Sequence, residues 1–140
     1  MDIRHLTPTY AVSPQIEPAD VAAIRAAGFT TVIDNRPDSE IPEHLQTPAI
    51  RAAVEAAGLT FVGNPLIRGA VADWDVAAQG AAIAAAGGGK VLAYCASGNR
   101  SSIAWALSQA GRTDADTLIA AAARHGYDLE PYRPLLAPRT

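Results

Sequence analysis

Short apolar blocks alternate along the chain with longer, more polar ones. The apolar blocks are rich in β-branched residues and predict buried strands at 9–13, 29–34, 59–62 and 90–94. The longer blocks open with Pro, Thr or Asp and close at a Gly, which is typical of helices. They predict helices at 18–27, 49–57, 73–86, 101–110 and 114–125.

Because strands and helices alternate, we expect an α/β fold with three αβα layers and a mostly parallel sheet of four to five strands. The chain has 140 residues, the size of one ordinary domain, and it shows no repeat and no linker. We therefore expect residues 1–140 to form a single domain, with 35–48 as a long loop inside it. In parallel sheets, ligands bind beyond the carboxyl ends of the strands. The loops that begin at Asn35, Gly63 and Cys95 should line the site.

Charge and composition argue against several classes of binding partner. The net charge is −3, which argues against a broad nucleic-acid surface. No apolar run approaches the roughly 20 residues of a membrane span, and the first residues lack the layout of a signal peptide. We therefore expect a cytoplasmic protein with neither nucleic-acid nor membrane partners. The single cysteine excludes an internal disulfide, and the three histidines lack ligand spacing, so we expect no metal and no cofactor.

The cysteine follows directly on a predicted strand. Cys95 is followed by Ala96, Ser97, Gly98 and Asn99, and then by Arg100 and Ser101, where a helix begins. A tight loop that enters a helix points several backbone N–H groups at one place and favours negative charge there. A thiol at such a place ionises more readily than a free one. The loop is therefore a candidate anion-binding site around a nucleophilic Cys95.

Three residues of this segment have separate roles in the prediction. Arg100 can grip an oxyanion with two hydrogen bonds, Gly98 permits a left-handed backbone, and Ser101 can donate to the thiolate. The alternative is a structural cysteine, because free Cys is among the most buried residue types. The Gly and Arg that follow at fixed spacing favour the functional interpretation.

The cysteine loop resembles the active-site loop of rhodanese-type sulfurtransferases and of cysteine-dependent phosphatases. The whole chain, from about residue 9 to 135, more closely resembles a bacterial family, the phosphatase-like domain of beta-lactamase hydrolase-like proteins. Besides the loop, the carriers are residues 26–38, 56–59 and 125–129. The resemblance implies a protein-tyrosine-phosphatase-like fold, Cys95 as nucleophile and Arg100 as the oxyanion-binding residue. It also identifies a departure, because Tyr94 stands where these phosphatases usually have His.

Two features favour sulfur transfer over phosphate chemistry. Four residues separate Cys95 from Arg100, as in rhodanese-type loops, whereas phosphatases of the resembled superfamily have five. Phosphate-ester cleavage also needs a proton for the leaving oxygen, and residues 62–68 contain no carboxylate. Sulfur transfer needs no such acid. The leading hypothesis is a sulfurtransferase that carries a persulfide on Cys95; the alternatives are a phosphatase with a phosphocysteine intermediate and a silent anion-binding module.

The remaining candidates lie outside the loop. Asp38, Asp73 or Asp75 would supply the acid of a phosphatase, although Asp38 is also a natural turn residue and the other two suit the first turn of a helix. Arg36 can help to hold an anionic substrate or can fix a surface turn. The expected partners are a small anion, namely thiosulfate, a persulfide or a phosphate ester, and for sulfur transfer an acceptor thiol.

Overall fold

A five-stranded sheet runs through the computed structural model, which describes residues 1–137. The strand order is β1-β2-β5-β3-β4, and only β1 is antiparallel to its neighbour. The mostly parallel sheet is therefore confirmed. The strands are β1 (Arg4–His5), β2 (Tyr10–Ser13), β3 (Phe29–Asp34), β4 (Thr60–Gly63) and β5 (Lys90–Tyr94).

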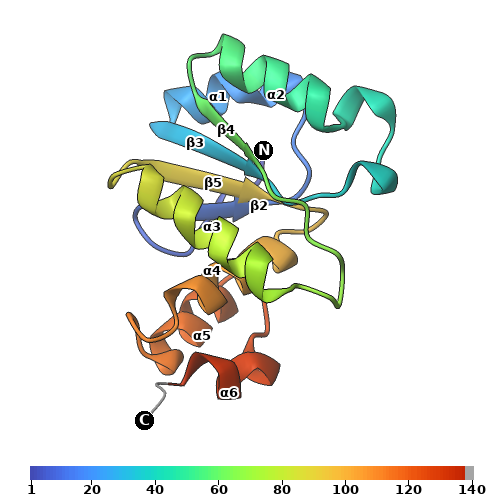
Figure 1. Ribbon diagram of the computed structural model, residues 1–140. Helices are drawn as coiled ribbons and strands as arrows, with labels where there is room; N and C mark the ends of the chain where they lie inside the picture. Colours follow the sequence, from blue (N-terminus) through green and yellow to red (C-terminus); the bar gives the residue numbers. More distant parts are fainter. Residues whose placement is uncertain (138–140) are drawn as a thin grey trace.

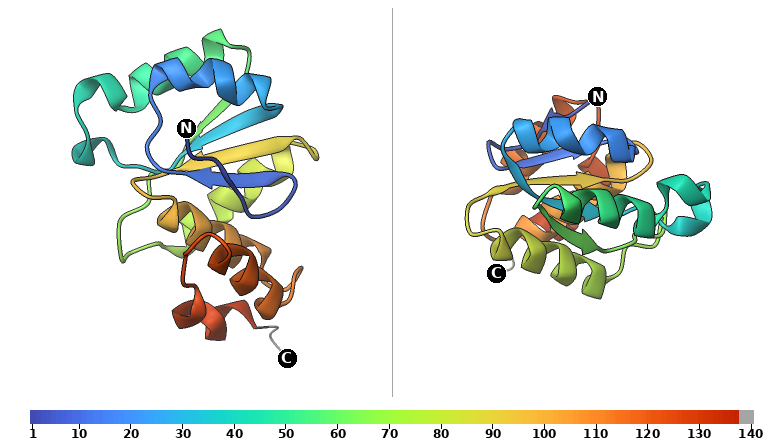
Figure 2. Two further views of the ribbon diagram at one scale, coloured as in Figure 1. Left: turned by 180° about the vertical axis from the view of Figure 1, so that it is seen from behind. Right: turned by 90° about the horizontal axis from the view of Figure 1, so that it is seen from above.

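Helices cover both faces of the sheet, which confirms the three layers. In Figure 1, helices lie above and below the sheet, and further helices pack beyond the lower layer. Figure 2 shows the same layers from behind and from above. The upper helices are α1 (Val21–Ala26) and α2 (Thr47–Ala56); the lower ones are α3 (Asp73–Ala85) and α4 (Asn99–Gln109); the outer pair is α5 (Ala115–Ala123) and α6 (Arg133–Leu136).

Each face of the sheet has its own apolar core. Along β3, Val32 points to the core beneath α1 and α2, whereas its neighbour Ile33 points to the core with α4 and α5. Leu92 and Ala93 divide in the same way along β5. Strands that are buried on both faces are apolar at nearly every position, which is why the sequence pattern locates them well. β5 lies in the middle of the sheet, so the loop that follows it is central too.

The structure departs from the predicted elements at several places. β1 has two residues and α6 has four, too few to produce a hydrophobic period, and neither was predicted. Helix α4 begins at Asn99, two residues before the predicted start. The predicted loop at 35–48 contains two short 3₁₀ turns, η2 (Asp38–Glu40) and η3 (Glu43–Leu45). Two further 3₁₀ turns are η1 (Pro18–Asp20) and η4 (Glu130–Tyr132).

A buried polar network joins the carboxyl ends of the strands to α3 and α4. The Gln79 side chain exchanges two hydrogen bonds with the Asn35 amide, accepts one from Asn64 and donates one to the Tyr10 hydroxyl. All four side chains are at least nine-tenths buried. Because a buried polar group without a partner is costly, each member depends on the others. The network fixes where the strand ends lie relative to the helix that carries Arg100.

We expect Gln79→Met, which keeps the volume but removes the amide, to lower the free energy of unfolding by about 2–4 kcal/mol. It leaves Asn35, Asn64 and Tyr10 each short of a partner, and a buried unsatisfied group costs about 1–3 kcal/mol. Urea unfolding followed by circular dichroism measures the effect. Gln109→Met, at the partly exposed end of α4, is the control and should change little. Equal stability of the two variants would contradict this role of the network.

Candidate active site

Cys95 lies at the bottom of a tight loop between β5 and α4. Its side chain is fully buried, and its Sγ accepts a hydrogen bond of 3.1 Å from the Gly98 backbone N–H. Gly98 has φ +94° and is the N-cap of α4, so the left-handed turn that the sequence predicted is present. The turn places the sulfur at the amino end of an 11-residue helix, where the helix dipole favours negative charge.

The outer side of this loop is held by Tyr127. Its hydroxyl donates to the Ser97 carbonyl at 2.7 Å and accepts from Arg4 Nη1 at 2.8 Å. A Cβ atom at Gly98 would collide with this hydroxyl, so close packing as well as the positive φ requires glycine. Sequence analysis assigned no role to Tyr127, because only the packing of distant segments brings it to the loop.

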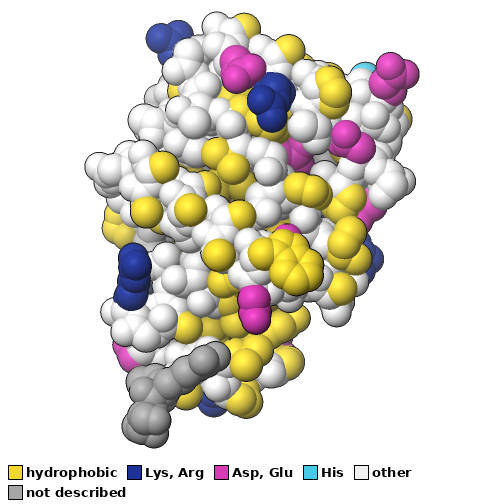
Figure 3. Space-filling view, viewed as in Figure 1, with side chains coloured by type: hydrophobic (Ala, Val, Ile, Leu, Met, Phe, Trp, Pro, Cys, Tyr) yellow, Lys and Arg dark blue, Asp and Glu magenta, His cyan; other side chains and the backbone are white. Residues whose placement is uncertain are grey.

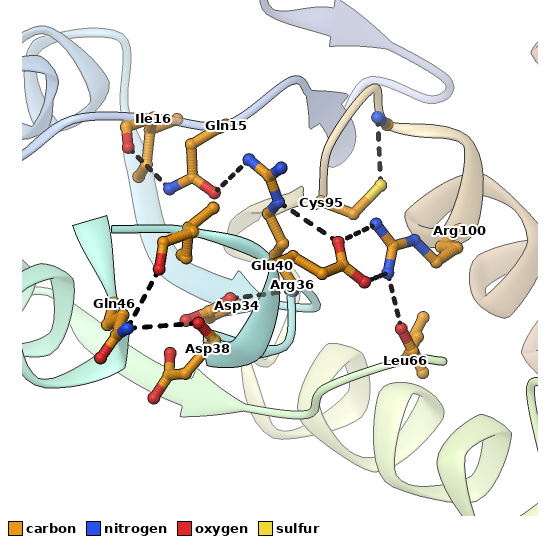
Figure 4. A network of polar contacts seen from close by, with 12 residues as sticks. Gln15, Ile16, Asp34, Arg36, Asp38, Glu40, Gln46, Leu66, Cys95 and Arg100 are labelled. Atoms are coloured by element: carbon orange, nitrogen blue, oxygen red, sulfur yellow. Dashed lines mark hydrogen bonds and ion pairs between the residues drawn. The ribbon is translucent and has the colours of Figure 1, made fainter. Parts of the chain in front are cut away.

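Arg100 is buried, and both terminal nitrogens of its guanidinium are hydrogen-bonded, as Figure 4 shows. Nη1 and Nη2 each donate to one oxygen of Glu40 at 2.8 Å, and Nη1 also donates to the Leu66 carbonyl at 2.8 Å. These charge-assisted bonds lower the pKa of Glu40 and raise the pKa of Arg100. The residue expected to bind an oxyanion is therefore already bound to a carboxylate of the same chain.

Arg36 joins the same charge cluster. Its Nε lies 3.4 Å from Glu40 Oε1, and its Nη1 donates to Gln15 at 3.3 Å. Two guanidinium groups thus share one carboxylate. Of this cluster, sequence analysis found Arg36 and Arg100 but missed Glu40. The loop position of Glu40 offered no signal, since its pairing depends on how residues 35–48 fold over the strand ends.

Asp34 and Tyr94 lie opposite each other in the register of β3 and β5. The Asp34 carboxylate accepts hydrogen bonds from the Arg36 N–H and the Thr47 hydroxyl, both at 2.9 Å, while burial raises its pKa. Burial, followed by the charge of Asp34, raises the pKa of Tyr94. Tyr94 is therefore neutral, and its ring belongs to the apolar core beneath α1 and α2. It does not supply the charge that a protonated His would bring next to Cys95.

The expected contact between Ser101 and the thiolate is not present. Ser101 Oγ donates to Asn35 Oδ1 at 2.8 Å, so it belongs to the buried polar network. The reason is the earlier start of α4, which places Ser101 in the first helical turn, facing the end of β3.

The three acids considered as proton donors lie apart from Cys95 or serve as caps. Asp38 accepts from the backbone N–H of Thr47 at the start of α2, and its Oδ1 lies 2.9 Å from the Thr47 hydroxyl, which Asp34 shares. Asp75 accepts from the Ala72 N–H and caps α3. Asp73 lines a hollow with Leu107 and Gly111, at the far end of α4 from the loop. Figure 3 shows hydrophobic side chains gathered on the face over α3. Trp74, in the first turn of α3, is exposed.

Among residues 1–137, no three His, Cys, Asp or Glu side chains group as metal ligands would. None of the helices described is both long and apolar enough to cross a bilayer.

The central strand of this mostly parallel sheet leads into a Cys-x₄-Arg segment at the start of a helix. Together with the helices on both faces, this arrangement defines a cysteine-loop protein of the tyrosine-phosphatase-like fold. Residues 2–112 match the model of a family, "Beta-lactamase hydrolase-like protein, phosphatase-like domain", and the chain belongs to that family.

The curated relatives are longer proteins. The chain is 33% identical over 131 residues to a beta-lactamase hydrolase-like protein of Xylella fastidiosa, and 31% identical over 123 residues to one of Agrobacterium fabrum. These matches cover 92% and 86% of this chain, but only 30% and 28% of the relatives. The chain therefore spans about a third of their length.

Solved structures agree with this assignment. A proposed phosphatase from Neisseria meningitidis is 33% identical, with TM-score 0.79, and the match covers 97% of this chain and 96% of that one. Tk-PTP, at 17% identity and TM-score 0.73, shares the fold; that match covers 94% of this chain and 89% of Tk-PTP. None of these relatives and neighbours is named a sulfurtransferase. The comparisons therefore favour the phosphatase alternative over the sulfur transfer that the loop length predicted.

The Glu40 ion pair makes a pH-dependent contribution to stability. Because the pKa of Glu40 is lower in the folded protein than in the unfolded chain, its contribution is complete above the unfolded value, about 4.3. This contribution to stability is lost as the pH falls through the pKa that Glu40 has in the folded protein. We expect the stability difference between wild type and Glu40→Gln to be constant near neutral pH and to shrink below about pH 4.

Urea unfolding at a series of pH values measures this difference. Glu43→Gln is the control, because Glu43 is exposed in the adjoining turn and makes no ion pair among the described residues. A difference for Glu40→Gln that grew toward low pH would contradict the assigned sign.

Proposed function

We propose that the protein is a cysteine-dependent phosphatase acting on phosphate monoesters. The Cys95 thiolate attacks phosphorus, an S–P bond forms, and the ester P–O bond breaks with its electron pair leaving on oxygen. Water then cleaves the S–P bond, which releases phosphate and regenerates the thiol. The chemistry is nucleophilic catalysis in two steps.

The observation that carries this proposal is the position of Cys95 Sγ against the Gly98 N–H at the start of α4, with Arg100 in the first turn of that helix. Membership in a family of phosphatase-like domains supports it. Backbone N–H groups aimed at one point stabilise the charge that develops on phosphoryl oxygens. The loop thus combines a nucleophile, an anion cradle and a cation.

Arg100 would bind two phosphoryl oxygens through the fork that now holds Glu40. A guanidinium pairs with carboxylate and phosphate in the same two-bond geometry. A phosphoryl group that reaches Arg100 therefore competes with Glu40 for Nη1 and Nη2. The bond to the Leu66 carbonyl keeps the guanidinium in place during that exchange.

The departing oxygen must either receive a proton or belong to a leaving group that is stable as an anion. Asp38 and Asp75 hold helix termini, and Glu40 lies in the right cluster but is held ionised by Arg100. This arrangement favours esters whose leaving group departs as a stable anion, such as aryl phosphates. General acid catalysis is worth about 10²–10⁴-fold where it operates.

Sulfur transfer is the second candidate, and the four-residue spacing between Cys95 and Arg100 favours it. In that reaction the thiolate attacks the outer sulfur of a sulfane donor, and sulfite or a thiolate leaves without protonation. An acceptor thiol then attacks the persulfide sulfur and restores the Cys95 thiolate.

The first test compares wild type, Cys95→Ser and Arg100→Lys on p-nitrophenyl phosphate. We expect the wild type to release phosphate and, after a rapid acid quench, to carry one phosphoryl group by intact mass. Cys95→Ser should show neither. Arg100→Lys keeps the charge but loses the fork, so we expect kcat/KM to fall about 100-fold.

Incubation of the reduced protein with thiosulfate separates the two candidates. A gain of one sulfur atom in the wild type alone, reversed by cyanide, together with no phosphoenzyme, would assign sulfur transfer and refute the phosphatase. Circular dichroism of each variant shows whether a lost activity reflects a lost fold.

We also expect a steep dependence of kcat/KM on the acidity of the leaving group. Alkyl phosphates should react at least about 100-fold more slowly than nitrophenyl phosphate, because no proton is supplied to the departing oxygen. A series of substituted phenyl phosphates, measured at one pH, provides the slope. A flat series that includes alkyl esters would show that a carboxyl group does protonate the leaving oxygen.

A further inference from the structure

An open pocket lies directly beside the cysteine loop. Its volume is about 560 Å³, within the range of small-molecule sites. Three segments form it: the loop between β4 and α3, the cysteine loop, and the turn after α5. It is lined by Arg68, Ser97, Asn99, Arg100, Gly126 and Tyr127.

The charged residues that line this pocket are both arginines, and no Asp or Glu lines it among residues 1–137. Arg100 is paired with Glu40 at the edge of the pocket. Arg68, by contrast, has no ion pair and no side-chain hydrogen bond within that described part of the chain, and it is exposed. The uncompensated charge of the pocket is therefore on Arg68.

The backbone holds Arg68 at a fixed place next to the site. The Ala70 N–H bonds to the Ile67 carbonyl at 2.9 Å, and Gly69 has φ +75°, as in a type II turn with Arg68 at its first corner. The preceding Leu66 is fully buried, and its carbonyl accepts from Arg100. Arg68 is thus two residues from the atom that anchors the oxyanion-binding arginine.

Two polar side chains complete the wall. Asn99 is exposed at the first position of α4, and the exposed Ser97 accepts from the Asn99 backbone N–H at 3.2 Å, which leaves its hydroxyl hydrogen to donate. An amide N–H and a hydroxyl next to an arginine are donors suited to an oxyanion. The pocket therefore offers donors and a positive charge, and no described carboxylate opposes them.

We propose that this pocket is a subsite for a second anionic group of a small substrate, with Arg68 as its charged ligand. The inference rests on the proposed phosphatase function and adds a substrate class to it: phosphate monoesters that carry a carboxylate or a further phosphate within reach of Arg68. The phosphoryl group to be cleaved lies over Cys95 and Arg100. The second anion selects the substrate and takes no part in bond breaking.

The test uses two esters that differ in one charge: phosphorylated hydroxyphenylpropanoate and its primary amide. We expect wild-type kcat/KM to be about fivefold higher for the carboxylate at low salt, since an exposed pair contributes modestly and is screened. In Arg68→Gln this ratio should fall to about one. Arg25→Gln removes an exposed arginine on α1, across the sheet, and should keep the wild-type ratio.

Binding of the non-hydrolysable phosphonate analogues, measured by calorimetry on the same three proteins, keeps the two proposals apart. If the wild type hydrolyses neither ester, the phosphatase proposal fails, and the Kd ratio of the two analogues still decides the subsite. A wild-type Kd ratio near one, or a preference for the carboxylate that survives in Arg68→Gln, would overturn the subsite.

Discussion

The left-handed turn at Gly98 is the constraint on which the site depends. β5 is buried on both faces and lies in the middle of the sheet, so its direction is fixed by its neighbours on both sides. The chain must then reverse into α4 within four residues, and the positive φ of Gly98 makes this possible. The same turn brings the Gly98 N–H to Cys95 Sγ. The path of the chain from β5 into α4 and the hydrogen bond to the Cys95 sulfur therefore depend on the same backbone conformation at Gly98.

Two sets of contacts hold that turn from opposite sides. Tyr127 and Arg4, from the two ends of the described chain, fix the Ser97 carbonyl on the outside. On the inside, Ser101 joins Asn35 and Gln79 in a buried network in which the paired groups satisfy one another. A network of this kind is rigid, because moving one member leaves its partners unsatisfied. The loop is thus prepared before a ligand arrives, which lowers the cost of binding an anion.

Much of the fold could be predicted from the sequence, and the physical reason is burial. Strands 29–34 and 90–94 agree with β3 and β5 residue for residue, since both faces of each strand pack into apolar cores. The cysteine loop was found because Gly and Arg follow Cys95 at a spacing that suits a strand-to-helix turn.

Glu40 could not be found in this way. Its role follows from a tertiary contact across 60 residues, and no local pattern encodes such a contact. Asp38 and Asp75 show the opposite case. Their positions in a turn and in the first turn of a helix already favoured local capping, and both carboxylates accept from backbone N–H groups.

The charges around Arg100 explain how a buried cation can be kept ready for an anion. An unpaired buried guanidinium would carry a large desolvation penalty, which the two bonds to Glu40 and the bond to the Leu66 carbonyl offset. Glu40 itself is 28% exposed, so it can turn toward water when another anion takes its place at Arg100. In the structure, Arg36 lies beside the same carboxylate and offsets part of its charge. Under the proposed function, Glu40 would hold the place of the substrate, because the fold stabilises Arg100 with a carboxylate in the two-bond geometry that a phosphoryl group would use.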